Sequence, residues 1–254
     1  MICFYTIIFL GGTCLGSLYH VIGYHMPIQK VWISNRSCCP QCLNQLKPHH
    51  LIPIVSYIIQ KGRCRYCYGK FKVIYLLIEM ITGILFIFPV WFYGFVGFQT
   101  GQIYIAWTFL SMLVIITVSD IYYQLILDKV LLFFGVILFF LYGMYPMYHL
   151  FSGIVGAGVG FFMLYGIGLL GKILFKKETL GGGDIKLYTV IGFLLGISNT
   201  FLSLMLSSIL ALIYLLLFMK DKTKPLAFGP FIAFSSYFCL FYGETLLNEY
   251  YQLF

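Results

Sequence analysis

Charge is scarce in this sequence. Asp, Glu, Lys and Arg together make up 9% of its 254 residues, 61% of the residues are hydrophobic, and the mean hydropathy is +0.94. Such a chain carries more apolar surface than one water-soluble core can bury, which excludes an ordinary soluble domain. Low-complexity segments and internal repeats are also missing. The composition predicts an all-α polytopic membrane protein.

About eight apolar runs have the length or near-length of a transmembrane helix. The first run starts at Met1 with no basic segment before it and no cleavage site after it, so we expect it to be retained rather than removed as a signal peptide. The predicted spans are residues 2–24, 73–95, 102–120, 127–147, 150–171, 184–198, 200–219 and 227–247, of which the sixth is short.

The net charge of +8 comes from 16 basic residues, and their positions predict the topology. Eight of the Lys and Arg residues lie between the first two spans, and the others adjoin spans three, five, six and seven. If the N-terminus is outside, all of them fall on the cytoplasmic side, as the positive-inside rule requires. The lipid bilayer therefore accounts for the basic charge, and no nucleic-acid partner is expected.

Five of the eight cysteines lie in the single long connection, residues 25–72. Cys39 and Cys42 form one CxxC pair, and Cys64 and Cys67 form a second. Two such pairs present four thiolates tetrahedrally, which is typical of a closed structural Zn²⁺ site. Because this segment is too small for a stable core of its own, a metal is a reasonable staple.

Other arrangements of the cysteine segment stay open. Disulfides would require an oxidising compartment, whereas the basic residues place the segment in the reducing cytosol. Cys38 is an alternative to Cys39 as a ligand, and His49 and His50 are also near, although the CxxC spacing favours Cys39. Four thiolates leave no open coordination position, so we expect the metal not to be the catalyst. We therefore divide the chain into a first transmembrane helix (1–24), a cytoplasmic zinc domain (25–72) and a transmembrane bundle (73–254).

Only eight residues are acidic, and two of them lie at the predicted cytoplasmic ends of helices. Asp120 ends the third span and Asp184 opens the sixth. An ionised carboxylate is costly in low dielectric, so an acid kept there is a candidate for function. Two such acids brought together share one proton, and one then activates water while the other protonates a scissile carbonyl. This is the arrangement of an aspartic protease.

Asp184 follows Gly181, Gly182 and Gly183, and the lack of Cβ atoms there lets an extended peptide approach the acid. Glycine also permits unusual φ angles before the helix begins. The alternative is that Asp184 is an ordinary N-terminal acid favoured by the helix dipole. Asp120 has its own alternative, as an acid at a span's end that reaches water.

Two further acids and a set of glycines have simpler interpretations. Asp128 is expected to form an ion pair with its neighbour Lys129, and we rank it below Asp120 for that reason. Glu79, inside the second span, is expected to hydrogen-bond a neighbouring helix. The spacing of Gly153, Gly156, Ala157 and Gly160 predicts close helix packing.

Taken together, these strings resemble the prepilin peptidase family, also called type IV leader peptidases, along nearly the whole chain. The opening GTCLGSLYHVIGYHMP (12–27) is similar to the family's first span, and IPIVSY (52–57) and KGRCRYC (61–67) are similar to strings around its CxxC pairs. EMITG (79–83) matches the start of its second span. GGGDIK (181–186) fits its GxGDxK motif, and FGPF (228–231) corresponds to its last span.

The resemblance implies a bacterial plasma-membrane aspartic endopeptidase. It would cleave the leader of prepilin-like and pseudopilin proteins after a glycine, at the cytoplasmic face. Asp120 and Asp184 carry over as the catalytic pair, Lys186 as active-site support with the three glycines, and the four cysteines as zinc ligands. Many members also methylate the new N-terminus with S-adenosylmethionine.

The sequence departs from the family pattern at two places. The first catalytic motif lacks the usual proline and reads Ile126-Leu127-Asp128. His20 and His25 stand where asparagine and arginine are common, so the methyltransferase activity is less firmly implied than cleavage.

Three alternatives predict different behaviour. Another GxGD protease, of the presenilin or signal-peptide-peptidase kind, would not predict the CxxC pairs. An ion- or proton-coupled transporter would use the acids for transport without peptide cleavage. In a membrane-anchored zinc adaptor the aspartates would be incidental. The sequence does not indicate which pilin-like proteins are cut or what oligomer forms.

Overall fold

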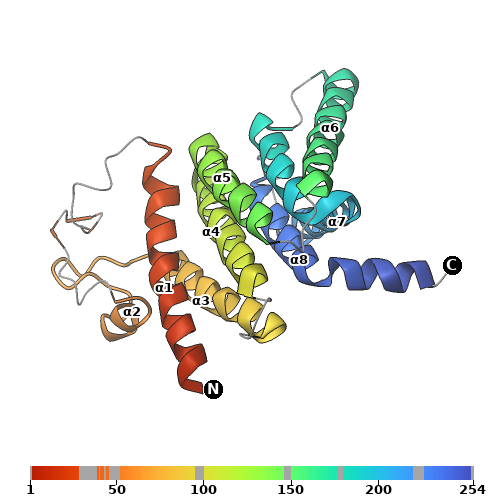
Figure 1. Ribbon diagram of the computed structural model, residues 1–254. Helices are drawn as coiled ribbons and strands as arrows, with labels where there is room; N and C mark the ends of the chain where they lie inside the picture. The colour runs from red at the N-terminus through yellow and green to blue at the C-terminus, as the bar shows by residue number, and fades with distance from the viewer. Residues whose placement is uncertain are drawn as a thin grey trace. The chain divides into compact units, whose positions relative to one another are not determined.

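A computed structural model describes residues 2–28, 39, 41–42, 44–45, 52–94, 100–145, 150–176, 180–219 and 226–252 (Figure 1). Cys38, His49 and His50 lie outside these residues. All elements longer than one residue pair within them are helices, and one isolated antiparallel bridge joins Arg63 to Lys70. The chain divides into two compact units, Met1–Thr100 and Gly101–Phe254. The predicted all-helical class is confirmed for the described residues.

The first unit contains α1 (Ile2–His25), the short α2 (Val55–Ile59) and α3 (Val73–Tyr93). Helices α1 and α3 pack side by side (Figure 1). Their contact depends on small residues, because a Cβ at Gly12 would lie 2.8 Å from the Cβ of Phe86 and one at Gly16 would lie 2.9 Å from that of Thr82. The glycines of the opening string therefore serve close helix packing.

The second unit contains α4 (Thr100–Tyr123), α5 (Asp128–Met144), α6 (Leu150–Phe175), α7 (Gly182–Phe218) and α8 (Gly229–Gln252). Helix α4 is the most deeply buried of the membrane-length helices, with 67% of its apolar window inside the protein. Its core residues include Phe109, Met112 and Ile116, each 0% exposed. A helix that is apolar on every side fits this central position.

Helix α7 folds back on itself. Gly196, at φ 72° and ψ −178°, breaks the helical geometry in its middle. The hydroxyls of Tyr188 and Ser207 lie 3.1 Å apart, whereas in a straight helix they would be separated by roughly 28 Å. The two arms are therefore antiparallel. We predicted two helices here, 184–198 and 200–219, and the reversal lies three residues before their predicted boundary.

The glycines predicted to pack closely meet the first arm of α7. A Cβ at Gly156 would overlap the carbonyl oxygen of Gly192, and one at Gly160 would overlap that of Tyr188. A Cβ at Gly153 would lie 3.0 Å from the ring and from the carbonyl oxygen of Phe193. The prediction of close packing by these glycines is confirmed.

Five helices of the described residues are long and apolar enough to cross a membrane: Ile2–His25, Val73–Tyr93, Thr100–Tyr123, Leu150–Leu174 and Gly182–Phe218. The protein is therefore a multi-pass membrane protein. Each of the eight predicted runs coincides with a helix or an arm of α7.

Candidate active site and metal centre

Asp120 is buried near the end of α4, with 6% of its surface exposed. Its Oδ2 accepts a hydrogen bond of 2.6 Å from the backbone N–H of Gly229, the first residue of α8. A Cβ at Gly229 would lie 2.8 Å from the same oxygen, so the approach requires glycine. The N–H groups of a helix's first turn lack partners within the helix, which makes this end of α8 a natural donor to a carboxylate. The alternative of a water-exposed acid at the span's end is wrong for Asp120 within the isolated chain.

Asp184 lies in the first turn of α7, three residues after the N-cap residue Gly181. Its carboxyl accepts a hydrogen bond from the backbone N–H of Gly181. This is the reciprocal half of a capping box, in which an acid at the third helical position reaches back to the N-cap. The acid is therefore held by the helix it opens, and the helix-dipole interpretation applies alongside any catalytic one.

The two acids form the candidate site, since Asp184 lies close enough to Asp120 for their charges to interact. Each accepts a hydrogen bond from a backbone N–H group. A carboxylate offers about four lone-pair positions, so most of the accepting capacity of the pair is left for water or substrate.

The three glycines do not all have the role that we expected. None has a positive φ, and Gly182 and Gly183 lie inside α7 rather than before it. The expected unusual backbone angles are therefore wrong. Gly183 is required for packing, since a Cβ there would lie 2.7 Å from the Cβ of Ile126, whereas a Cβ at Gly182 would meet nothing within 4 Å.

The tight turn after α4 begins beside Asp120 and packs against the residue before Asp184. Ser119, which is 0% exposed and precedes Asp120, donates a 2.5 Å hydrogen bond to the carbonyl of Leu125. The next residue, Ile126, packs on Gly183. Leu127 caps α5 with φ −80°, close to the angle that proline would impose. The turn therefore forms without the family's proline, and Ser119 is a site residue that our sequence reasoning missed.

Lys186 forms an ion pair with Asp128, with 2.7 Å between Nζ and Oδ2. The expected pairing of Asp128 with Lys129 is wrong in its partner. Both side chains are more than half exposed, so the pair contributes at most about 1 kcal/mol to stability. The pair links the start of α5 to the start of α7. Asp128 is exposed, whereas Asp120 is buried.

The four predicted metal ligands meet in the first unit. The sulfurs of Cys39, Cys42, Cys64 and Cys67 all lie within 4.8 Å of one another. Two of the separations are 3.8 Å, between Cys39 and Cys67, and 4.0 Å, between Cys42 and Cys64. Sulfurs about 2.3 Å from a tetrahedral Zn²⁺ would be about 3.8 Å apart, whereas a disulfide requires about 2.05 Å. The cluster could hold a metal ion, and its cysteines are free thiols.

The backbone of the second CxxC pair also favours a thiolate at Cys64. Burial opposes ionisation of this thiol, but backbone N–H groups of Cys67 and Tyr66, with the side chains of Cys39 and Cys67, bond its sulfur and lower its pKa to about 7. At Cys42, despite a backbone hydrogen bond from Asn44, burial and the other three thiols raise the pKa to about 11. Metal ligands must be deprotonated, so backbone donors of this kind prepare the sulfur for a cation.

Glu79 is a hydrogen-bonding residue, as predicted. Its Oε2 accepts a 2.9 Å bond from the backbone N–H of Ile54, and Ser17 of α1 also hydrogen-bonds its carboxyl. Ile54 has φ 61°, an unusual angle for a β-branched residue. Glu79 therefore fastens the start of α2 to α3, and this partner was not predicted from the sequence.

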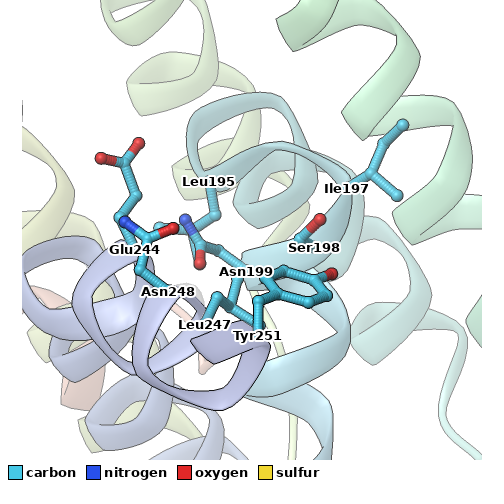
Figure 2. A pocket seen from close by; sticks show the side chains of 8 residues that line it. All are labelled: Leu195, Ile197, Ser198, Asn199, Glu244, Leu247, Asn248 and Tyr251. Atoms are coloured by element: carbon cyan, nitrogen blue, oxygen red, sulfur yellow. The ribbon is translucent and has the colours of Figure 1, made fainter. Parts of the chain in front are cut away.

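A separate pocket of about 410 Å³ lies where α7 reverses, beside the far part of α8. Figure 2 shows the side chains that line it, among them Asn199, Glu244 and Asn248. Glu244 follows Gly229 by 15 residues in α8, or roughly 20 Å along a helix. Because it holds a single acid and lies far along α8 from Asp120, this pocket is not the site of the aspartates.

Comparison with known proteins gives two family matches. Residues 10–93 match the family model described as Bacterial Peptidase A24 N-terminal domain, and residues 107–216 match that of the Type IV leader peptidase family. No solved structure matches the chain.

Curated relatives match over most of their length. The chain is 32% identical to the prepilin leader peptidase/N-methyltransferase of Bacillus subtilis (strain 168), over 98% of both chains. It is also 32% identical to the protein of the same name from Neisseria gonorrhoeae, over 79% of this chain and 69% of that one. The corresponding protein of Pseudomonas aeruginosa is 30% identical over 85% and 74%.

Proposed function

The chain belongs to the Type IV leader peptidase family, and from that membership we propose that Asp120 and Asp184 are the catalytic pair with which it cleaves prepilin leaders. The observation that carries the proposal is the meeting of a buried acid at the end of α4 with an acid in the first turn of α7. The resemblance to prepilin peptidases and the membrane location of the enzyme agree with this assignment.

Hydrolysis by such a pair needs one shared proton. One carboxylate takes a proton from water, and the oxygen of that water attacks the scissile carbonyl carbon while the other, protonated carboxyl donates to the carbonyl oxygen. Collapse of the tetrahedral intermediate breaks the C–N bond. The amine leaves with the proton that the first carboxylate took from water, and a hydroxyl of the intermediate returns a proton to the second carboxylate. The N–H of Gly229 holds Asp120 in place during these steps, and the exposed Gly181 and Gly182 leave space for an extended substrate.

The substrate is a prepilin-like or pseudopilin membrane protein. Its apolar helix lies in the bilayer and its short basic leader in the cytosol, so the bond after the leader's glycine lies at the interface. We propose an outside N-terminus and eight crossings, made by α1, α3, α4, α5, α6, the two arms of α7, and α8. This topology puts both aspartates and residues 25–72 on the cytoplasmic side.

The cysteine cluster is proposed to hold structural Zn²⁺. The sulfur separations fit a tetrahedral ion, and four thiolates leave no position for substrate. We propose that residues 25–72 are the zinc domain and that the bundle of residues 73–254 carries the peptidase. S-adenosylmethionine is the proposed methyl donor for the second activity in the relatives' names, and we assign it no binding residues.

The test uses purified protein and a prepilin-like substrate. Wild-type protein should remove the leader, while Asp120→Asn and Asp184→Asn should each lower kcat by at least about 10³-fold, since each removes a proton-transfer group. Asp128→Asn is the matched control and should cleave normally. Normal cleavage by either of the first two variants would remove that residue from the pair.

A further inference from the structure

The segment before α3 carries charge of one sign only. Residues 25–72 contain eight Lys and Arg residues but no Asp or Glu, and the first acid of the whole chain is Glu79. Three of these cations, Lys61, Arg63 and Arg65, line a hollow of about 510 Å³ with Ile59, Gln60, Cys64 and Tyr68. We call this hollow the basic hollow.

The backbone keeps the cations of the basic hollow together. Arg63 pairs with Lys70 in the antiparallel bridge. The Cys64 N–H donates to the carbonyl of Gly69, and the Tyr68 N–H donates to that of Cys64, each over 2.9 Å. The turn at the second CxxC pair therefore keeps like charges near one another. A bound anion stabilises such an arrangement.

The basic hollow also lies next to a membrane helix. The Phe71 N–H donates a 2.8 Å hydrogen bond to the carbonyl of Gly62, between Lys61 and Arg63. Phe71 precedes the start of α3, Val73, by two residues, or about 7 Å of extended chain. This short connection keeps the cations close to the start of the membrane helix, and charges within the Debye length of about 8 Å at physiological salt are only partly screened.

Apolar side chains border the cations. Ile58, Ile59 and Tyr68 are 64%, 71% and 74% exposed. Glu79 holds the start of α2 against α3, six residues beyond the helix's first residue, so the two isoleucines at the end of α2 are kept beside the membrane helix. Exposed cations next to exposed aliphatic and aromatic side chains are typical of a surface that lies in a membrane interface.

We propose that the basic hollow binds the anionic headgroup of a phospholipid in the protein's own membrane, with Ile58, Ile59 and Tyr68 entering the interface beside it. The basic leader of the substrate is not a suitable occupant, because its charges would be repelled. The lipid site is inferred from the residues around the second CxxC pair and from the start of α3. It therefore does not depend on whether the aspartates are catalytic.

The test measures lipid binding by the full-length protein in detergent. Phosphatidylglycerol or phosphatidylcholine is titrated in, and retained lipid is counted by native mass spectrometry at low ionic strength. Wild-type protein should bind phosphatidylglycerol more tightly than phosphatidylcholine. The triple variant Lys61→Gln, Arg63→Gln, Arg65→Gln should lose about fivefold in phosphatidylglycerol affinity per cation removed, on the order of 100-fold in all.

Two controls separate a defined site from general attraction. Lys220→Gln with Lys222→Gln and Lys224→Gln removes the same charge from the sequence between the predicted spans 200–219 and 227–247, and should change the affinity little. Arg63→Lys with Arg65→Lys keeps the charge and should keep most of the binding. Metal content and helicity show whether the triple variant is folded, and if it is not, Arg65→Gln alone should lose about fivefold.

Three outcomes would overturn the proposal. The first is a folded triple variant, or a folded Arg65→Gln protein, that keeps wild-type affinity for phosphatidylglycerol. The second is an equal loss in the Lys220, Lys222 and Lys224 variant. The third is complete displacement of the lipid by excess inorganic phosphate, which would assign the hollow to a free phosphate instead.

Discussion

The two units of this protein hold their polar groups in opposite ways. In the first unit the four cysteine sulfurs lie within 4.8 Å of one another, and Glu79 accepts hydrogen bonds from Ile54 and Ser17. In the second unit Asp120 and Asp184 each accept one backbone N–H bond. A centre whose bonding capacity is used within the protein stabilises structure, whereas one with spare capacity can act on a substrate.

The two centres also differ in their surroundings. The four cysteines lie in a segment that has little core of its own, which a bound metal would hold together. Asp120 instead lies on α4, whose core residues are fully buried, and Asp184 lies on α7, which packs against α5, α6 and α8, so their positions are set by the bundle. We therefore expect perturbation of the first centre to affect folding and perturbation of the second to affect catalysis.

Loss of the metal should give the largest effect on stability. Cys39→Ser with Cys64→Ser removes two of four ligands, and structural zinc contributes about 10 kcal/mol in small zinc domains. Metal content should fall to background and the first unit should lose its protection from proteolysis. Cleavage should fall much less than in Asp120→Asn, because the metal takes no part in the reaction.

A measurement of activity could contradict the purely structural role of the metal. If chelation abolished cleavage as completely as Asp120→Asn while helicity and protease resistance were unchanged, the metal would be part of the catalytic machinery.

Substitution of the two helical glycines should separate catalysis from substrate binding. Gly183→Ala places a Cβ 2.7 Å from that of Ile126, which displaces Asp184, and a shift of about 1 Å can lower kcat by about 100-fold. Gly182→Ala meets no neighbouring atom and should raise KM instead, by filling substrate space.

Steady-state kinetics with a prepilin-like substrate distinguish the two effects. Ile126→Ala should partly restore kcat to Gly183→Ala, because it removes the colliding side chain. Gly166→Ala, where a Cβ also meets nothing within 4 Å, is the control. Equal changes in kcat and KM for the Gly182 and Gly183 variants would contradict the packing role of Gly183.

Ser119→Ala should give a smaller loss. It removes the hydrogen bond to Leu125 that shapes the turn carrying Ile126, and one such bond contributes about 1 kcal/mol. We expect kcat to fall by about five- to tenfold with KM unchanged.

The matched control for Ser119 is Ser236→Ala. That serine is also 0% exposed, but its hydroxyl bonds carbonyls of its own helix. A similar loss of kcat in both variants would mean that Ser119 acts only through general packing.

The exposed ion pair should matter least. Lys186→Ala should lower the free energy of unfolding by less than about 1 kcal/mol, because both partners are more than half exposed. Thermal unfolding in detergent at low and high salt measures this contribution. A loss of several kcal/mol would show that the link between α5 and α7 holds the bundle together.

The sequence predicted the helices well and their contacts poorly. Apolar runs identify helices because the pattern is local, and the same is true of the CxxC pairs. The N–H bond from Gly229 to Asp120 joins residues 109 positions apart, so no local pattern contains it. The bond from Ile54 to Glu79 joins the start of α2 to the interior of α3, 25 positions further on, so no local pattern contains it either.

The glycines before Asp184 show a second limit. Their composition suggested an unusual backbone, yet Gly183 is needed because Ile126 from another element lies against it. A glycine in a sequence can mean a turn or a close neighbour, and only the packing of distant elements decides between them. The break at Gly196 was likewise predicted only as a boundary between spans, three residues away.

The central claim is that Asp120 and Asp184 work as one unit, and a double-mutant cycle tests it most directly. Leader cleavage is measured for Asp120→Asn, Asp184→Asn and the double variant, with metal content and helicity confirming the fold. Groups that share one proton are strongly non-additive, so the double variant should cleave no more slowly than either single variant. Independent roles would instead multiply the two losses, and a double variant slower by the product of the single effects would contradict the account.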